Sequence, residues 1–346
     1  MVEIPKTMKR VVLTSPNSDM SKVVLTVEEV PVPTPKSGEV LIKVAAAPIN
    51  PSDYGVWRNT HPDKCPLPIG NEGSGVVVAS GGGLAPLLCG VGTKVGFVNV
   101  PKGQGAYSEY VTAAAMTGVF PMEADLQVEA AASFFVNPYT VVGMLDTAAQ
   151  LGAKAIVHTA AASQVGQMLV KLAKQRGVTL INVVRREEQA ALLRSIGAQL
   201  VVVTDAPGWE ATLAALIAEH KATVAFDAIA GETTGKMVSA LPPKSTTFVY
   251  GGLSREPVGG VNPIDLIYHR KQLKGWLLTN WVLAGGMFST LPRLRAARLL
   301  VNPGLKPGGW AESKFIDCTL DGMFERFLAM YNTSGFTDAK LRIRFA

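Results

Sequence analysis

The stretch 154–167 constrains the fold of this chain more than any other. Its sequence, KAIVHTAAASQVGQ, predicts a short buried strand, a turn of small residues and the start of a helix. Such an arrangement places a dinucleotide pyrophosphate at a helix N-terminus, where backbone amides and the helix dipole attract anions. The usual glycine fingerprint is incomplete, because its positions carry Ala161, Ser163 and Gly166. The turn therefore indicates a nucleotide site, with an ordinary strand-to-helix connection as the alternative.

A second apolar strand, residues 178–184, ends in Arg185 and Arg186. NAD-specific sites usually have an acidic residue here, which accepts from the ribose 2′-hydroxyl. Two guanidinium groups suit a 2′-phosphate instead, because they form charge-assisted hydrogen bonds with it. The sequence therefore predicts NADPH as the cofactor.

The composition excludes several classes of protein. The chain has 346 residues, of which 48% are hydrophobic and 17% charged, so it can bury the cores of two domains. Its net charge of +6 is too small to indicate nucleic-acid binding, and no run resembles a membrane span. Three scattered cysteines exclude a disulfide framework: Cys65, Cys89 and Cys318. No signal-peptide pattern is seen, so we expect a cytoplasmic protein; a mitochondrial one would need a preceding transit peptide.

The strand pattern changes along the chain. Short β-branched runs separated by proline and glycine fill residues 9–120 and indicate a barrel-like β domain. From about residue 125, apolar strands alternate with helices up to residue 250, which is typical of a doubly wound parallel sheet. An apolar run at 273–279 predicts its sixth strand.

The tail returns to the first domain. Amphipathic patterns predict helices near 287–301 and 320–331, and a last strand follows at 340–345. The predicted fold class is α/β, with a Rossmann domain beside a β-rich catalytic domain. We assign 125–279 to the Rossmann domain, and 1–124 with 280–346 to the β-rich domain.

This organisation resembles the medium-chain dehydrogenase/reductase superfamily over nearly the whole chain. The motifs that carry the resemblance are PVPTP (31–35), SGEVL (37–41), INPSD (49–53), PIGNEGSG (68–75) and GTKV (92–95). It implies a GroES-like barrel for the β-rich domain. Because the last Rossmann strand commonly pairs across a two-fold axis in this superfamily, it also implies a homodimer, which would cover the apolar edge at 273–279.

Zinc-dependent members of the superfamily carry a G-H-E triplet whose histidine binds the metal. The triplet here, residues 70–72, is GNE, and asparagine is a poor zinc ligand. The histidines lie far apart, at His61, His158, His220 and His269. We predict that there is no metal, that hydrogen-bond donors polarise the substrate, and that His158 is a buried core residue.

Among the zinc-free branches, the chain is most similar to the 2-enoyl thioester reductases of mitochondrial type. The matching segments are VNPYT (136–140), AASQVG (161–166), INVVRR (181–186), YGGL (250–253) and LKGWLLTNW (273–281). The resemblance implies cofactor contacts at Asn137, Thr140, Ala162, Ser163, Gln164, Val165, Arg185, Arg186, Tyr250, Gly251, Gly252, Leu253, Trp276, Leu277, Leu278, Thr279 and Lys340. For the apolar members of this set, core packing is the alternative.

The chain departs from this family at the catalytic tyrosine. The family has it eight residues after the aspartate of INPSD, where this chain has His61; Tyr54 directly follows Asp53. In the family the tyrosine helps hold the thioester carbonyl. An imidazole can donate the same hydrogen bond, and a cationic one can deliver a proton. We predict His61 as the replacement, with Tyr54 or a solvated-loop histidine as alternatives, and give Asn50 and Asp53 orienting roles.

The resemblance implies an NADPH-dependent, zinc-free reductase that acts on the conjugated C=C bond of 2-enoyl thioesters, carried by CoA or acyl carrier protein. One alternative is an NADPH:quinone or alkenal oxidoreductase. Another is a non-catalytic NADPH-binding protein, which the missing tyrosine supports. Three arginines of the tail could hold a phosphopantetheine phosphate or an acidic carrier, unless they form a solvated face: Arg293, Arg295 and Arg298.

Overall fold

The computed structural model describes residues 3–98, 104–333 and 339–345. The chain forms two compact units: unit 1 comprises residues 1–138 and 294–346, and unit 2 comprises residues 139–293. Both divisions fall inside a helix, α3 (Val136–Gln150) and α10 (Met287–Gly304). Within the described residues, no helix has the length and apolar character needed to cross a membrane.

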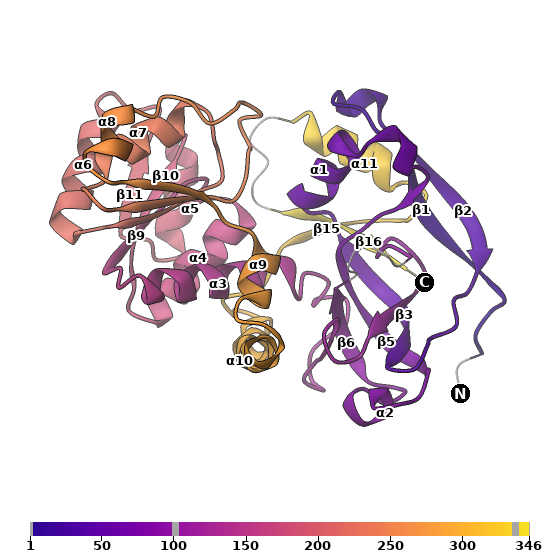
Figure 1. Cartoon of the computed structure of the whole chain (residues 1–346). Helices are drawn as coiled ribbons and strands as arrows, with labels where there is room; N and C mark the ends of the chain where they lie inside the picture. The colour runs from indigo at the N-terminus through magenta and orange to yellow at the C-terminus, as the bar shows by residue number, and fades with distance from the viewer. Residues whose placement is uncertain (1–2, 99–103, 334–338, 346) are drawn as a thin grey trace. The chain divides into compact units, whose positions relative to one another are not determined.

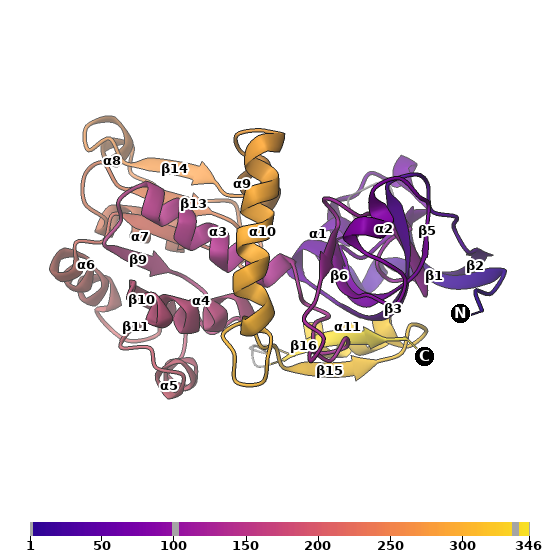
Figure 2. The same cartoon turned by 90° about the horizontal axis from the view of Figure 1, so that it is seen from below.

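Unit 2 contains a six-stranded sheet in the order β11-β10-β9-β12-β13-β14, and all neighbouring strands are parallel. Helices cover both faces of this sheet (Figures 1 and 2). The strands are β9 (Ala155–His158), β10 (Thr179–Val184), β11 (Leu200–Val203), β12 (Val224–Asp227), β13 (Thr246–Val249) and β14 (Gln272–Gly275). The helices include α4 (Gln164–Gln175), α5 (Glu187–Ser195), α6 (Trp209–His220), α7 (Glu232–Ala240), α8 (Pro263–Ile267) and α9 (Leu278–Leu283). The predicted doubly wound parallel sheet is confirmed.

The central strands of this sheet form because helices bury both of their faces. Every residue of β9 and β12 is buried, so these strands appear in the sequence as continuous apolar runs rather than alternating ones. Val157, Ile181 and Ala225 share one core with Leu213 and Met237 of the covering helices. This double burial explains why the strands could be located from the sequence.

The sixth strand is shorter than predicted. It was expected over 273–279, but β14 ends at Gly275 and α9 begins at Leu278. β13 pairs with β14 only from Thr246 to Val249, so residues beyond 275 have no strand to pair with. The apolar residues Leu278, Trp281 and Val282 are instead buried at helical spacing.

Unit 1 is built on a seven-stranded sheet, in the order β15-β16-β3-β5-β6-β8 with β7 on β3, and a three-stranded sheet, β2-β1-β4. The strands of the larger sheet are β3 (Glu39–Pro48), β5 (Glu72–Ser80), β6 (Lys94–Val98), β7 (Tyr110–Ala114), β8 (Val119–Pro121), β15 (Phe315–Cys318) and β16 (Lys340–Arg344). Those of the smaller sheet are β1 (Thr7–Ser15), β2 (Val24–Pro31) and β4 (Leu67–Pro68). This β-rich domain matches the predicted GroES-like class.

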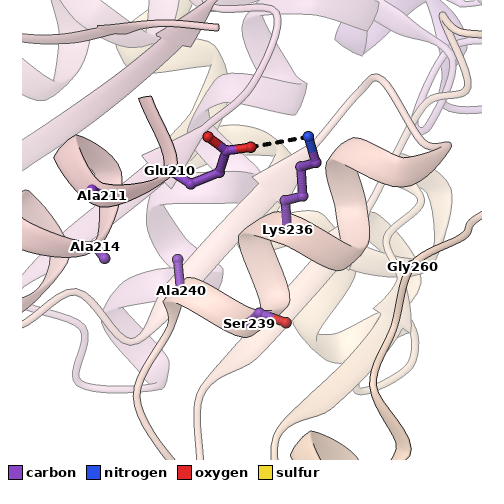
Figure 3. Close-up of a pocket in the computed structure, with 7 residues that line it drawn as sticks. All are labelled: Glu210, Ala211, Ala214, Lys236, Ser239, Ala240 and Gly260. Atoms are coloured by element: carbon purple, nitrogen blue, oxygen red, sulfur yellow. Dashed lines mark ion pairs between the residues drawn. The ribbon is translucent and has the colours of Figure 1, made fainter. Parts of the chain in front are cut away.

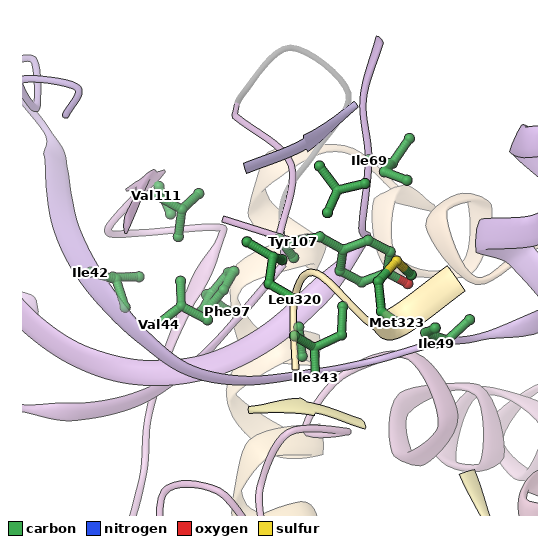
Figure 4. Packing of buried hydrophobic residues seen from close by; sticks show 14 of the residues in the cluster. Ile42, Val44, Ile49, Ile69, Phe97, Tyr107, Val111, Leu320, Met323 and Ile343 are labelled. Carbon is green, nitrogen blue, oxygen red and sulfur yellow. The ribbon is translucent and has the colours of Figure 1, made fainter. Parts of the chain in front are cut away.

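The core of unit 1 joins residues from both ends of the chain. Ile42, Val44 and Phe97 from the strands pack in one cluster with Tyr107 and with Ile343 from β16 (Figure 4). Two helices, α1 (Pro51–Asn59) and α11 (Met323–Tyr331), also contribute to this cluster. The short elements are α2 (Ala85–Leu88) and the 3₁₀ helices η1 (Met20–Lys22) and η2 (Pro62–Lys64).

Helix α1 was not predicted, and it positions several candidate site residues. Asn50 stands at its N-cap, Pro51 occupies its first turn, and the Asp53 carboxylate accepts a hydrogen bond from the Asn50 backbone amide at 2.7 Å. Proline and an acidic residue are both favourable in a first turn. The buried indole of Trp57 packs edge-on to the Phe327 ring of α11.

Candidate functional site

The sheet of unit 2 has its topological switch point between β9 and β12. The chain proceeds from β9 through β10 to β11 on one side, then returns to β12, β13 and β14 on the other. In open α/β sheets, ligands bind at the carboxyl ends of the strands next to such a point. The candidate cofactor site therefore lies where β9, β10, β12 and β13 end.

The turn after β9 is built for a close approach between helix and strand. Ala160 adopts the left-handed backbone conformation, φ 49°, that glycine usually provides. Ser163 caps α4 by accepting from the Gly166 amide at 3.2 Å. A Cβ on Gly166 would lie 2.1 Å from the Ala161 carbonyl oxygen, so only glycine fits there. The turn thus brings the start of α4 close to the end of β9 despite its missing glycines.

The Asp227 side chain forms four hydrogen bonds at the end of β12. This fully buried carboxylate accepts from the hydroxyl groups of Thr159 at 2.6 Å and Thr234 at 2.5 Å. It also accepts from the backbone amides of Ile229 at 2.9 Å and Ala230 at 3.2 Å. These bonds connect β9, the turn after β12 and α7.

The two predicted arginines lie where β10 meets α5. The Gln189 side-chain oxygen accepts from the backbone amides of Arg185 at 3.0 Å and Arg186 at 3.1 Å, which fixes this corner. The Arg186 Nε is buried and has no hydrogen-bond partner among the residues that the structure describes. A buried donor without an acceptor is costly, and a phosphate oxygen would supply the acceptor. The corner therefore fits the 2′-phosphate of NADPH.

The segment 250–253 runs from the end of β13 beside the residues that follow β12. The Tyr250 amide donates to the Asp227 carbonyl at 2.8 Å, and the Leu253 amide donates to the Ala228 carbonyl at 2.9 Å. A Cβ on Gly251 would come within 2.9 Å of that same Ala228 oxygen, whereas Gly252 faces open space.

The other predicted cofactor residues have varied surroundings. Trp276 uses its indole N–H to donate to Thr147 Oγ1 at 3.1 Å, while the Leu277 side chain is exposed. Leu278 is buried in the first turn of α9, where Thr279 also lies. The residues at the start of α3 and α4 include Asn137, Thr140, Ala162, Gln164 and Val165. Their contacts with a cofactor stay predictions.

Unit 1 contains a buried polar network that links four segments distant in the sequence. The Lys340 Nζ donates to Asn50 Oδ1 at 2.6 Å and lies 3.4 Å from Ser133 Oγ. The Asn50 side-chain amide donates to Glu72 Oε1 at 2.9 Å. The other Glu72 oxygen accepts from the backbone amides of Phe135 and Val136, each at 2.8 Å. Glu72 thus connects β5, α1 and the start of α3.

Burial sets the electrostatics of this network. Burial raises the pKa of Asp53 to about 7, although the hydrogen bond from the Asn50 backbone amide opposes the shift. It also raises the pKa of Glu72, against the attraction of Lys340. Burial lowers the pKa of Lys340 to about 8, and Glu72 and Asp53 counteract that shift. Asp53 can therefore hold or release a proton near neutral pH.

His61 and Tyr54 occupy different environments. His61 stands at the N-cap of η2, its side chain 69% exposed and its Nδ1 3.3 Å from an Asp63 carboxylate oxygen. The Tyr54 ring packs against those of Phe327 and Tyr331, with centroid separations of 5.5 and 5.7 Å. A catalytic role for either stays a prediction.

Asn71, in the GNE triplet at residues 70–72, forms hydrogen bonds with the start of α1. The Asn71 amide group donates to Ser52 Oγ at 3.1 Å, and the Asn71 backbone amide donates to the Asp53 carboxylate at 3.1 Å. Across the described part of the chain, no three or more His, Cys, Asp or Glu residues gather in a group that could hold a metal ion. His158 is fully buried in β9, as predicted.

Sequence reasoning missed several residues that build these sites. Glu72 lies within the examined GNE triplet, but its buried partners cannot be read from that triplet. Asp227 could have been noticed, because it ends an apolar strand and precedes a glycine-containing turn. Arg293, for which an anionic ligand and a solvated face were the alternatives, donates through Nη1 to the carbonyls of Trp281, Val282 and Ala284 at the end of α9.

A separate pocket of about 420 Å³ is lined by residues of α6 and α7 together with Gly260 (Figure 3). Glu210 and Lys236 form an ion pair of 3.0 Å at this pocket. None of the predicted site residues lines it. The other residues that line the pocket are alanine, serine and glycine, so they offer few functional groups to a ligand.

Comparison with known proteins places the chain in a family. Residues 36–124 match the family model of the alcohol dehydrogenase GroES-like domain, and residues 165–293 match that of the zinc-binding dehydrogenase. A mitochondrial enoyl-[acyl-carrier-protein] reductase of Xenopus tropicalis is 32% identical over 269 residues, which cover 75% of this chain and 74% of the relative. The Arabidopsis thaliana protein of the same name is 28% identical over 260 residues, 72% of this chain and 67% of the relative.

A solved structure agrees with these matches. A Mesorhizobium loti protein, provisionally described as an NADPH:quinone reductase, superimposes with a TM-score of 0.85 and is 30% identical; the alignment covers 99% of this chain and 100% of the other. Sequence and structure agree with the resemblance seen in the motifs. The chain therefore belongs to the zinc-independent medium-chain dehydrogenase/reductases and is an oxidoreductase.

Proposed function

We propose that this protein is an NADPH-dependent, zinc-free reductase of the conjugated C=C bond in 2-enoyl thioesters. The observation that carries the cofactor is the buried Arg186 Nε beside Arg185 at the end of β10, which lacks an acceptor among the described residues. The substrate class rests on the similarity to enoyl-[acyl-carrier-protein] reductases. The acyl group would be carried by CoA or by an acyl carrier protein.

Several segments of unit 2 would hold this cofactor. The first turn of α4, with Ala162, Ser163, Gln164 and Val165, would bind the pyrophosphate through backbone amides. Arg185 and Arg186 would bind the 2′-phosphate. The segments 250–253 and 276–279 would hold the nicotinamide half, to which the family resemblance adds Asn137, Thr140 and Lys340. When bound, NADPH supplies a hydride for the β-carbon of the substrate.

Residues of unit 1 would handle the charge and the proton. Reduction of a conjugated C=C bond places negative charge on the carbonyl oxygen, where a positioned donor lowers the barrier. His61 is our first candidate for that donor and Tyr54 the second. Asp53 accepts from two backbone amides, those of Asn50 and Asn71, and so fixes the start of the helix that carries Tyr54. Asn50 and Asp53 therefore orient the site.

A second candidate function is an NADPH:quinone or alkenal oxidoreductase. The similarity to the Mesorhizobium loti structure favours it, and so does the exposure of His61, because quinone reduction needs no positioned acid. A protein that binds NADPH without using it is the remaining alternative.

We also retain the proposal of a homodimer in the cytoplasm. Among the described strands β14 pairs with β13 alone, and three of its four residues are exposed at the sheet edge. Ile264 and Ile267 of α8, and Tyr268 directly after it, are also exposed. An exposed strand edge with apolar neighbours is a liability that a two-fold partner would remove.

Turnover assays separate these functions. We expect NADPH oxidation with crotonyl-CoA to proceed faster, by kcat/KM, than with naphthoquinone or an ortho-quinone. The matched control is butyryl-CoA, which lacks the double bond and should give no turnover. Faster turnover of the quinones would shift the assignment to quinone oxidoreductase. Binding of NADPH without turnover of either class would indicate a non-catalytic protein.

Coenzyme preference tests the arginine corner. We expect native protein to prefer NADPH over NADH, and Arg185→Ala or Arg186→Ala to weaken NADPH binding by about 1.5–3 kcal/mol, roughly tenfold or more, with little effect on NADH. Dissociation constants from fluorescence titration give both values. Arg194→Ala is the control, because this arginine of the same helix pairs with Glu187 at the surface. Equal affinities of the native protein for both coenzymes would refute the assignment.

A further inference from the structure

One buried polar contact in unit 2 is not explained by packing alone. His158 at the end of β9 is fully buried, and its Nε2 lies 2.6 Å from the Tyr250 hydroxyl. The two rings are nearly parallel, 16° apart, with centroids separated by 5.9 Å. Because β12 lies between β9 and β13 in the sheet, this contact connects two strand ends that are not neighbours.

The other nitrogen of His158 decides which group donates. Burial lowers the pKa of His158 to about 3, so the imidazole is neutral near pH 7 and carries one N–H and one lone pair. Its Nδ1 is buried and has no hydrogen-bond partner within the part of the chain that the structure describes. Buried N–H groups without a partner are rarer than buried acceptors without one. The proton therefore belongs on Nε2, which donates to the Tyr250 oxygen.

This assignment leaves the phenolic hydrogen of Tyr250 available for another acceptor. Tyr250 is only partly buried, and it stands at the carboxyl end of the sheet. In the proposed cofactor site, the turn after β9 holds the pyrophosphate and the arginines after β10 hold the adenosine half. The nicotinamide half must then extend to the other side of β9, over β12 and β13, where Tyr250 lies.

We infer that Tyr250 donates its hydroxyl hydrogen to the carboxamide oxygen of the nicotinamide group and that His158 is the positioning residue for this hydroxyl. The inference rests on the proposed NADPH function. It adds a neutral donor to the site and gives the buried histidine a role that a core aliphatic residue could not fill. A donor at the carboxamide also restricts the rotation of the nicotinamide ring.

A pair of ligands tests the inference. NADPH and 2′-phospho-ADP-ribose share the adenosine and pyrophosphate groups, but only NADPH has the carboxamide. We expect Tyr250→Phe to raise the dissociation constant for NADPH about three- to tenfold and to leave that for 2′-phospho-ADP-ribose unchanged. An equal effect on both ligands, or none on either, would overturn the inference alone. Failure of the native protein to bind either ligand would overturn the cofactor proposal beneath it.

Variants at His158 test the positioning role. His158→Leu should reproduce the selective loss of NADPH affinity, whereas His158→Gln, whose amide can donate to Tyr250, should restore much of it. Phe248→Leu is the control, because Phe248 lies in β13, two residues before Tyr250, and its ring stacks on that of Phe226. Equal weakening of both ligands by His158→Leu would indicate a merely structural histidine.

The tautomer can be read from the native protein, independently of whether a variant folds. Nitrogen-15 NMR of labelled histidine should show His158 neutral and protonated on Nε2 at pH 7. A proton on Nδ1 would mean that Tyr250 donates to His158 and has no hydrogen left for the cofactor, which would overturn the inference.

Discussion

Replacing Glu72 with alanine is expected to lower the free energy of unfolding of unit 1 by about 3–5 kcal/mol, because each buried hydrogen-bond donor left without its acceptor costs about 1–3 kcal/mol. Glu72 is fully buried and provides much of the negative charge near Lys340. Its removal leaves that ammonium group poorly compensated. The substitution also leaves the Asn50 side-chain amide and the backbone amides of Phe135 and Val136 without their hydrogen-bond acceptor.

Urea unfolding at pH 7 gives the size of the effect, and hydrogen exchange of β5 and β16 assigns it to unit 1. Glu187→Ala is the matched control, since Glu187 pairs with Arg194 at the surface and such pairs contribute at most about 1 kcal/mol. If Glu72→Ala costs no more than this control, the network is not a structural requirement of unit 1.

The largest expected effect on activity is at His61. If His61 replaces the family's tyrosine, His61→Ala should lower turnover of crotonyl-CoA by about 10²-fold or more, because one positioned acid or oxyanion donor is lost. The affinity for NADPH should change little, since the residue does not belong to the proposed cofactor site. Steady-state kinetics and NADPH titration on the same preparation measure both quantities.

Tyr54→Phe is the companion variant. It removes one hydroxyl and keeps the ring that packs against Phe327 and Tyr331. A small effect of Tyr54→Phe together with a large one of His61→Ala supports His61 as the donor, and the opposite pattern assigns the role to Tyr54. Full activity in both variants would count against a positioned acid and favour the quinone oxidoreductase.

The parts of the fold that depend on local patterns could be predicted from the sequence. The strand 155–158, the turn with Gly166 and helix α4 follow from apolar runs, small residues and helical periodicity, all within one short stretch. The end of β14 could not be predicted, because it is set by where the partner strand β13 stops. Leu278 was attributed to the strand, although its spacing from Trp281 and Val282 is helical.

The polar network of unit 1 could not be predicted from the sequence, because its members lie far apart in the chain. Lys340 and Asn50 are separated by 290 positions in the chain, and no motif connects them. Both were named as site residues from the family resemblance, yet their contact with each other was not foreseen. Residues whose role depends on a distant partner, such as Glu72 and His158, become recognisable only when the folded chain brings them together.

The position of β16 has a consequence for how the protein is made. This strand lies between β15 and β3 in the sheet of unit 1. Its first residue, Lys340, interacts electrostatically with Glu72 and Asp53. Domains fold as they emerge during synthesis, the N-terminal ones first. Unit 2 is continuous in the chain, whereas residues 1–138 belong to a unit that also needs β16, which is translated after the whole of unit 2. Residues 1–138 can therefore complete their sheet only after β16 has been made, and until then Glu72 and Asp53 lack the Lys340 ammonium group.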